Sequence, residues 1–283
     1  MISTGQGPDA SPDLSDFSDK LVLVGAGRMG TALLEGWLRL GLDLKNVAVL
    51  EPQPLPQITA LAARGLQLNP DPNALANVAA VVIALKPQVA AQAIPGLTPF
   101  ISASTVVVSI MAGRTLHFLE SALARPCAMV RAMPNTPAAI GRGITVAVPY
   151  RATPAQRGLA DRLLRATGEV EWIDDESLMD AVTAVSGSGP AYVFLLAEAL
   201  AQAGVAAGLP PPLAAKLARE TVAGSGELLH RSALDAATLR ENVTSPGGTT
   251  AAALAVLMAQ NGLAPLMIRA VAAATERSRE LAG

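Results

Sequence analysis

Cysteine and histidine are scarce in this 283-residue sequence, which holds one cysteine, Cys127, and two histidines, His117 and His230. A single cysteine excludes an intrachain disulfide and a metal cluster held by several thiolates, and we interpret Cys127 as a small apolar residue in a strand. Neither histidine falls in a motif, so we interpret both as residues on helix surfaces. The HExxH and CxxC patterns of metal and redox sites are also missing. The sequence therefore favours a chemistry that needs little acid–base help from the protein and no metal.

Charge and long apolar runs are also limited. The net charge is −2 at pH 7, so we expect neither nucleic acid nor an anionic membrane as a partner. The most apolar long stretch, residues 191–209, contains Glu198 and Gln202, which interrupt it as a membrane-spanning helix. Residues 1–19 lack the basic start and apolar centre of a signal peptide. We therefore predict a cytoplasmic protein in which residues 1–19 form a disordered acidic tail.

Short apolar runs alternate with helical patterns between residues 20 and 173. Several of these runs are rich in valine and end at glycine or proline, as buried parallel strands do. Strands that alternate with helices predict an α/β fold with a parallel, doubly wound sheet. The expected strands are residues 21–24, 47–50, 66–68, 80–85, 105–110, 128–131 and 144–148.

The character of the sequence changes after about Ile173, where the β-branched runs end. Alanine-rich helical patterns follow and predict an all-α region over residues 174–283. Much of its apolar surface would be hard to bury in a monomer, so we expect this region to form a subunit interface. The expected helices are residues 174–185, 190–208, 210–230, 235–242, 248–260 and 263–282.

A Gly25-x-Gly27-x-x-Gly30 pattern lies between the first expected strand and the first expected helix. Gly25 allows a tight turn, Gly27 lets a pyrophosphate approach the backbone, and Gly30 lets helix and strand pack closely. The helix N-terminus adds free N–H groups and the positive end of its dipole. The pattern predicts a dinucleotide-binding domain over residues 20–173. The alternative is a tight turn that binds no ligand.

Glu51 ends the second expected strand, about twenty residues after the last glycine of the loop. A carboxylate at this place accepts both ribose hydroxyls of NAD and repels the 2′-phosphate of NADP. No arginine follows it, because the next residues are Pro52-Gln53-Pro54. We therefore expect NADH to be preferred, with NADPH as the second candidate cofactor. The alternative is an ordinary exposed glutamate at a strand end.

Two other strand ends carry unusual residues. Leu85-Lys86-Pro87 ends the fourth expected strand, and residues 131–137, with the sequence RAMPNTP, end the sixth. Both lie at the edge where doubly wound sheets bind ligands. Lys86 and Asn135 are therefore candidate ligand-binding residues. The alternatives are a solvated charge for Lys86 and a turn-forming residue for Asn135.

Residues 243–250, with the sequence VTSPGGTT, precede an alanine-rich helix. The proline and glycines leave the first backbone N–H groups of that helix uncovered, and Ser245, Thr249 and Thr250 add hydroxyl groups. We interpret the loop as a cradle for an anion of carboxylate size. The alternative is an ordinary helix N-cap. Residues 186–192, SGSGPAY, also introduce a helix with bare backbone, and they either contact a ligand or allow close helix crossing.

These features together favour the reduction of a protonated cyclic imine. The histidine–aspartate pair that 2-hydroxy-acid dehydrogenases use is missing from the motifs. An iminium substrate already carries the positive charge that accepts hydride from a nicotinamide. The protein then has to orient the ring carbon and to anchor a carboxylate. We therefore predict a nicotinamide-dependent reductase of a small imino acid.

The order and spacing of the motifs resemble the pyrroline-5-carboxylate reductase family. The motifs are GxGxMG, the strand-end Lys-Pro, MPNTP, SGSGPAY and TSPGGTT, and the resemblance runs from about residue 20 to the C-terminus. It implies a Rossmann-type domain followed by an all-α dimerisation domain through which two subunits interlock; larger rings of dimers also occur. It also implies hydride transfer to the imine carbon of 1-pyrroline-5-carboxylate, which gives L-proline in the last step of proline biosynthesis.

The resemblance also implies roles for individual residues. Thr250 would lie near the ring nitrogen and is the catalytic candidate for hydrogen bonding or proton delivery there. Asn73 would touch the adenine ribose. The residues that would bind substrate are Ser245, Gly248, Thr249, Thr250 and Asn135. The residues that would bind the cofactor are Gly25, Gly27, Arg28, Met29, Gly30, Glu51, Asn73, Leu85, Lys86, Pro87 and Met133. Many family members that favour NADPH have a small or polar residue where this sequence has Glu51.

Two alternatives share the expected architecture. A relative of the β-hydroxy-acid dehydrogenases would use a lysine of the helical domain as its acid–base residue. Lys216, the one lysine after Lys86, lies mid-helix without the glycine-rich context that this role requires. A non-catalytic NAD-binding protein would keep the fold but would have no need of the TSPGGTT cradle. Both alternatives, and that of another imine reductase, are therefore ranked below the family that the motifs resemble.

Overall fold

A computed structural model describes residues 13–282, so residues 1–12 of the predicted tail lie outside the described residues. The chain divides into two compact units. The first comprises the residues up to Gly187 together with those from Ser278 onward, and the second comprises Ser188–Arg277. The predicted boundary at 173/174 marks the change from strands to helices, whereas residues 174–187 pack with the first unit.

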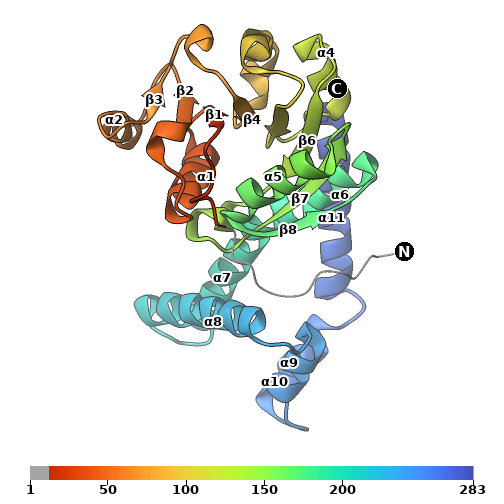
Figure 1. The fold of residues 1–283 in the computed structure, drawn as a ribbon. Coiled ribbons are helices and arrows are strands. Elements are labelled where there is room, and N and C mark those ends of the chain that lie inside the picture. The colour runs from red at the N-terminus through yellow and green to blue at the C-terminus, as the bar shows by residue number, and fades with distance from the viewer. Residues whose placement is uncertain (1–12, 283) are drawn as a thin grey trace. The chain divides into compact units, whose positions relative to one another are not determined.

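A sheet of eight strands forms the centre of the first unit, in the order β3-β2-β1-β4-β5-β6-β7-β8 (Figure 1). All neighbouring strands are parallel except β6 and β7, which are antiparallel. The order reverses between β1 and β4, as in Rossmann-type folds, so the predicted α/β class is confirmed. The strands are β1 Lys20–Val24, β2 Val47–Leu50, β3 Gln67–Leu68, β4 Val78–Ile83, β5 Val106–Ser109, β6 Ala128–Met133, β7 Gly143–Tyr150 and β8 Gly168–Trp172.

The predicted parallel sheet contains one antiparallel pair, β6 with β7. Residues 134–142, between β6 and β7, are too few for the crossover that a parallel pair needs, so β7 returns antiparallel. Strand β8 was not expected from the sequence GEVEW, which has one valine between two glutamates. It lies at the edge of the sheet and buries Val170 alone, so it lacks the apolar run that marks a central strand.

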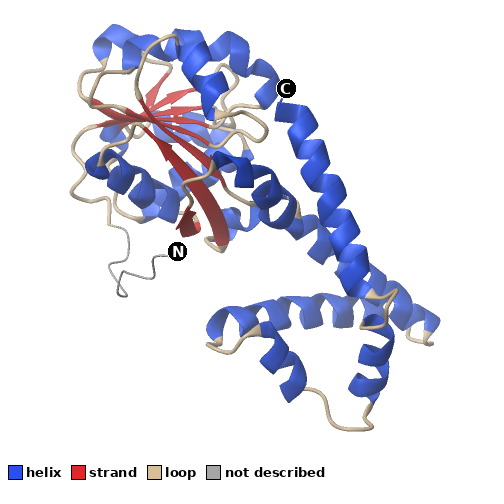
Figure 2. Ribbon diagram, turned by 90° about the vertical axis from the view of Figure 1, so that its right-hand side faces the viewer, coloured by secondary structure: helices blue, strands red, loops and turns tan. Residues whose placement is uncertain are grey.

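Helices cover both faces of the sheet (Figure 2). The α-helices of the first unit are α1 Arg28–Arg39, α2 Pro56–Ala62, α3 Ala90–Ala93, α4 Leu116–Leu123, α5 Pro154–Arg165 and α6 Met179–Val182, and a π-helix, η7, spans Thr183–Gly187. On one face α1 and α5 meet, where the Trp37 indole N–H donates to the Leu163 carbonyl oxygen at 2.8 Å. On the other face α4 buries Leu119 beside Ile94 and Phe100. The two apolar clusters hold the carboxyl ends of β1, β4 and β6 at one edge.

Residues 13–19 pack against the first unit, which corrects this part of the predicted disordered tail. Leu14 is fully buried and Phe17 is 9% exposed, and both belong to the core cluster of α1. Arg162 on α5 donates to the carboxylate of Asp16. This acidic segment therefore contains two large apolar side chains that are buried in the core. The composition of the segment did not indicate their burial.

The described residues of the second unit form helices that are joined by loops, without a strand. The helices are α7 Gly189–Ala206, α8 Pro211–Arg231, α9 Ala236–Asn242, α10 Thr249–Leu257 and α11 Leu263–Ala282, of which the end from Ser278 belongs to the first unit. Each of them confirms a predicted helix to within three residues of its expected limits. Helices α7 and α8 pack together, and a Cβ on Gly204 would lie 3.2 Å from the Ala214 Cβ.

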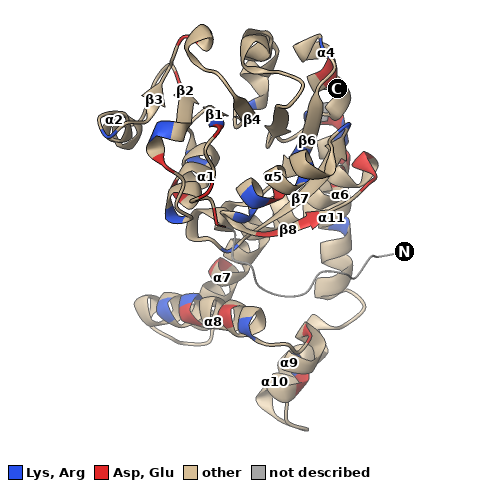
Figure 3. Cartoon of the chain, viewed as in Figure 1, with Lys and Arg blue, Asp and Glu red and all other residues tan. Residues whose placement is uncertain are grey.

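The helices of the second unit expose large apolar side chains. Helices α7 and α10 bury no side chain and carry almost no charge (Figure 3). Phe194 and Leu195 of α7 are 68% and 63% exposed. The helical run over residues 176–206 is long and apolar enough to cross a bilayer by length and composition, and 6% of its most apolar window is buried. Apolar surface of this extent in a single chain is typical of an interface.

Candidate functional site

Three glycines shape the loop between β1 and α1, and they do so in different ways. Gly25 has a φ of +89°, and a Cβ there would lie 2.8 Å from the Ala84 carbonyl oxygen. A Cβ on Gly30 would overlap the Gly25 carbonyl oxygen. A Cβ on Gly27, in contrast, would meet nothing within 4 Å. Gly25 and Gly30 are thus required by packing, whereas Gly27 leaves open space in front of the helix.

The N-terminus of α1 faces this open space. Gly27 is the N-cap and no side chain caps the helix, so its first N–H groups are available to an anion. Arg28 is exposed and Met29 is half-buried at the same turn. The Thr31 hydroxyl donates to the Ala26 carbonyl oxygen at 3.0 Å and braces the loop from inside. An uncapped helix start beside open backbone fits the pyrophosphate of a dinucleotide.

Glu51 follows β2 and reaches the glycine loop. Its carboxylate accepts hydrogen bonds from the backbone N–H groups of Ala26 and Gln53, both at 3.0 Å. The side chain of Asn69, directly after β3, bonds to the Glu51 backbone twice. A carboxylate at the end of β2 beside the loop fits an adenine ribose. Sequence reasoning missed Asn69, because an asparagine before a proline indicates only a turn and its partner lies 18 residues away.

The residues after β4 adjoin the same loop. A Cβ on Gly25 would lie 3.2 Å from Leu85 Cδ2, so Leu85 borders the turn. Lys86 is exposed at the start of the 3-10 helix η3, Pro87–Val89. The Pro87 carbonyl oxygen accepts from Arg114 Nε at 3.2 Å and Nη2 at 2.9 Å. Arg114, which follows β5, thereby holds the predicted Leu85–Lys86–Pro87 segment, and no sequence motif marked it.

The end of β6 brings two further predicted residues to this edge. Met133 ends the strand, and a Cβ on Gly187 would lie 2.6 Å from Met133 Cε. Glycine at 187 therefore lets η7 approach the strand end, whereas a Cβ on Gly189 would meet nothing within 4 Å. Asn135 Oδ1 accepts from the backbone N–H of Ile144 at 3.0 Å and so fixes the start of β7.

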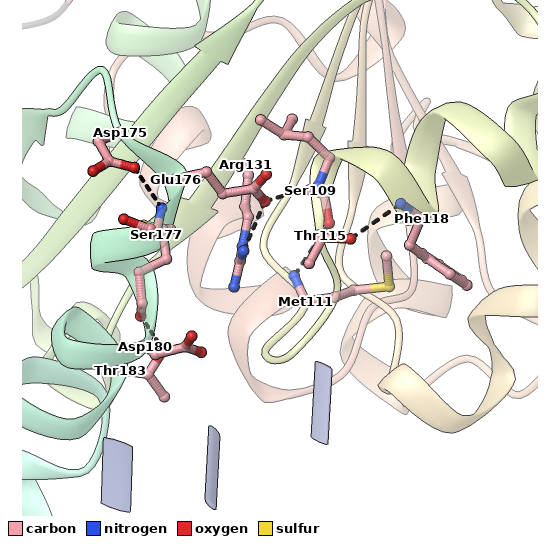
Figure 4. A network of polar contacts seen from close by, with 12 residues as sticks. Ser109, Met111, Thr115, Phe118, Arg131, Asp175, Glu176, Ser177, Asp180 and Thr183 are labelled. Carbon is pink, nitrogen blue, oxygen red and sulfur yellow. Dashed lines mark hydrogen bonds and ion pairs between the residues drawn. The ribbon is translucent and has the colours of Figure 1, made fainter. Parts of the chain in front are cut away.

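A polar network joins β6 to the segment that leaves the first unit (Figure 4). Arg131 is 5% exposed, and its guanidinium donates to Glu176 Oε1 at 2.7 Å. The same oxygen accepts from the backbone N–H of Leu116, at the start of α4, at 2.8 Å. Nearby, the hydroxyl of Ser177 and its backbone N–H donate to Asp175 and lower the pKa of that carboxyl. The network was not predicted, because Arg131 and Glu176 are 45 residues apart.

Asn73 lies in a short turn of the first unit. Asp71 caps the 3-10 helix η2, Pro72–Ala74, by accepting a hydrogen bond from Asn73 N at 2.9 Å. The side-chain amide of Asn73 also donates to Asp71, at 3.0 Å. Its contact with the adenine ribose stays a prediction.

The predicted anion cradle lies in the second unit, between α9 and α10. Gly248 is the N-cap of α10 and no side chain caps that helix. A Cβ on Gly248 would overlap Ser245 Oγ, so glycine is needed for the serine hydroxyl to lie against the helix start. Ser245 and Thr249 are exposed and Thr250 is half-buried. The loop thus combines uncapped N–H groups with hydroxyl groups, which is the donor set for a carboxylate.

The remaining residues that the sequence analysis discussed belong to other elements. His117 on α4 and His230 on α8 are exposed, as predicted, and Lys216 is exposed on α8. Cys127 is buried next to β6, and this burial raises the pKa of its thiol. Over residues 13–282, no group of three or more His, Cys, Asp or Glu side chains is placed to hold a metal ion.

Comparison with known families matches both units. Residues 176–281 match the family described as pyrroline-5-carboxylate reductase dimerisation. Residues 20–113, which contain the glycine loop and Glu51, match the family described as NADP oxidoreductase, coenzyme F420-dependent. A dinucleotide-binding domain is therefore followed by a dimerisation domain.

Individual relatives match over nearly their whole length. The pyrroline-5-carboxylate reductase of Synechocystis is 40% identical, over 94% of this chain and 99% of that protein. The structure of a pyrroline-5-carboxylate reductase from Coxiella burnetii has a TM-score of 0.86 at 33% identity and covers 94% of this chain and 99% of its own. The pyrroline carboxylate reductase of Plasmodium falciparum, solved with NADP bound, has a TM-score of 0.78 at 30% identity and covers 94% and 98%.

Proposed function

Since this chain belongs to the pyrroline-5-carboxylate reductase family, we propose that it reduces the C=N bond of 1-pyrroline-5-carboxylate and gives L-proline, the last step of proline biosynthesis. The observation that carries this proposal is the pair of uncapped helix starts, one behind Gly27 and one behind Gly248. The first suits a pyrophosphate and the second a small carboxylate.

The first unit binds the nicotinamide dinucleotide, which supplies the hydride when bound. Gly27 and the start of α1 receive the pyrophosphate, with Arg28 and Met29 at the same turn. Glu51 accepts hydrogen bonds from the adenine ribose and repels a 2′-phosphate, so we propose that NADH is preferred over NADPH. The other residues that we assign to the cofactor are Gly25, Gly30, Asn73, Leu85, Lys86, Pro87 and Met133, and Asn135 is assigned to the substrate.

The second unit holds the substrate carboxylate. Ser245, Gly248 and Thr249 supply backbone and hydroxyl donors to it. The Thr250 hydroxyl hydrogen-bonds to the ring nitrogen and assists its protonation. The iminium form of the substrate already carries the positive charge that attracts hydride, so the protein supplies orientation and a carboxylate anchor rather than a histidine base.

The chain acts as a homodimer through its helical domain. The dimerisation match covers the helices that expose Phe194 and Leu195, and a second copy would bury them. We propose that this copy, rather than a membrane, covers the apolar helices, and that dimers assemble further into rings. We also propose that the enzyme is cytoplasmic and that no nucleic acid takes part, as the sequence predicts. Light scattering should give a dimer or a multiple of it, and a monomer would contradict this assembly.

One assay tests the proposed reaction. The purified chain is mixed with pyrroline-5-carboxylate and with NADH or NADPH, and cofactor oxidation is followed by absorbance. We expect turnover with both cofactors and a higher kcat/KM with NADH. If neither NADH nor NADPH gave turnover, the proposal would be overturned.

A further inference from the structure

The backbone of Glu51 is held by a side chain from the neighbouring strand. Glu51 N donates to Asn69 Oδ1 at 2.8 Å, and Asn69 Nδ2 donates to the Glu51 carbonyl oxygen at 3.0 Å. An asparagine amide offers one acceptor and two donors, so it can pair with both groups of one peptide residue at once. Asn69 thus bonds to Glu51 as the backbone of a strand neighbour would.

This side chain extends the sheet where the backbone pairing stops. Strand β3 pairs with β2 only at Gln67 and Leu68, and Asn69 N adds one more bond, to the Val49 carbonyl oxygen at 2.8 Å. Glu51 lies beyond the last of these pairs. Asn69 has a φ of +48°, in the left-handed region that asparagine tolerates better than most residues. The turn at Asn69 therefore points its amide back at Glu51.

The same glutamate bonds to the glycine loop through its side chain. Its carboxylate accepts from Ala26 N and Gln53 N, both at 3.0 Å. Asn69 fixes the backbone of Glu51, and Glu51 in turn places one negative charge beside the loop. Charge repulsion falls with distance, so a carboxylate that is free to swing away discriminates less between the two cofactors.

We propose that Asn69 is a positioning residue for cofactor selection, acting through Glu51. This inference rests on the proposed preference for NADH. It goes beyond the role of Glu51 itself, because Asn69 follows a different strand and acts only by holding the Glu51 backbone. Removal of the Asn69 amide should therefore weaken the selection while the Glu51 charge is still present.

The test measures the dissociation constants of NADH and NADPH by fluorescence titration of the substrate-free protein. The variants are Asn69→Gly, Glu51→Ala and the double variant. Glycine adopts a positive φ without strain, so Asn69→Gly is expected to fold. The matched control is Asn77→Gly, because Asn77 also has a positive φ, +57°, but lies at the amino-terminal end of β4, whereas the glycine loop lies at the carboxyl ends of the strands.

Asn69→Gly should lower the ratio of the NADPH dissociation constant to the NADH dissociation constant by roughly three- to tenfold. A change of this size corresponds to the coupling expected for residues in direct contact. Glu51→Ala should lower the ratio further, the double variant should match Glu51→Ala, and Asn77→Gly should leave it unchanged. An unchanged ratio in Asn69→Gly, with a narrowed ratio in Glu51→Ala, would overturn this inference alone. An unchanged ratio in Glu51→Ala would show that Glu51 does not select the cofactor, and it would overturn the proposed role of Glu51 as well.

Discussion

Replacement of Gly27 by alanine should weaken cofactor binding and leave the fold intact. Gly27 has φ −73° and ψ −166°, which alanine adopts, and its Cβ would meet nothing within 4 Å. Alanine is a poorer N-cap than glycine by several tenths of a kcal/mol, but it lowers the entropy of the unfolded chain by about 0.4–1 kcal/mol. The two effects nearly cancel, so we expect the free energy of unfolding to change by less than ~0.5 kcal/mol.

The same methyl group would occupy the space that a pyrophosphate needs in front of α1. The loss of one hydrogen bond to a charged group costs about 1.5–3 kcal/mol, so the dissociation constant for NADH should rise roughly ten- to hundredfold. Titration with NADH measures this constant, and thermal unfolding of the cofactor-free protein measures the stability. An NADH affinity equal to that of the unsubstituted chain would show that the pyrophosphate does not approach Gly27.

Gly30→Ala is the matched comparison, because it adds the same methyl group three residues later in the loop. Its Cβ would overlap the Gly25 carbonyl oxygen and lie 3.2 Å from the Ala84 Cβ. Both neighbours belong to packed backbone and core, so the variant should lose about 1–3 kcal/mol of stability. A stable Gly30→Ala, or an unstable Gly27→Ala, would refute the different roles assigned to the two glycines.

Three further predictions concern other parts of the chain. Thr250→Ala should lower kcat/KM for pyrroline-5-carboxylate by at least about tenfold and leave the NADH dissociation constant unchanged, and a parallel loss of NADH affinity would argue against a substrate-side role. Glu176→Ala should cost about 3 kcal/mol in urea unfolding at fixed protein concentration, because it leaves the buried Arg131 without its ion-pair partner. A loss of less than ~1 kcal/mol would be typical of an exposed pair instead. Leu14→Ala and Phe17→Ala should each lower the stability by about 2–5 kcal/mol, because both side chains are buried in the core, and unchanged melting temperatures would contradict this packing.

The central strands of the sheet could be predicted because burial on both faces favours runs of apolar residues in their sequences. Strands β1, β4 and β5 are covered on both faces, so they carry valine-rich runs. The edge strand β8 buries Val170 alone and carries no such run. The antiparallel β7 has the same apolar pattern that a parallel strand would have, and only the length of its connection sets its direction. Periodicity therefore identifies strands better than it orients them.

The site could be predicted where its chemistry belongs to the backbone. The two uncapped helix starts need glycines and hydroxyl residues at fixed local spacings, which a sequence displays directly. Asn69 and Arg114 act instead through paired hydrogen bonds to residues that are distant in the sequence. Each is one polar residue in a loop, and its partner is brought near only by the order of the strands. Such residues support the site without forming a motif, so local patterns miss them.

The Arg131–Glu176 pair belongs to neither the Gly27 loop nor the Gly248 loop, but it holds a segment through which the helical unit is attached. The chain leaves the first unit after Gly187 and returns to it at Ser278. Ser278 Oγ donates to Asp180 Oδ1 at 2.6 Å, so the outgoing and returning segments are bonded to each other. Glu176 bonds the outgoing segment to Arg131 of β6, two residues before Met133. The outgoing and returning segments are therefore linked, within the first unit, to β6. This strand ends at the edge of the sheet that carries the proposed cofactor-binding residues.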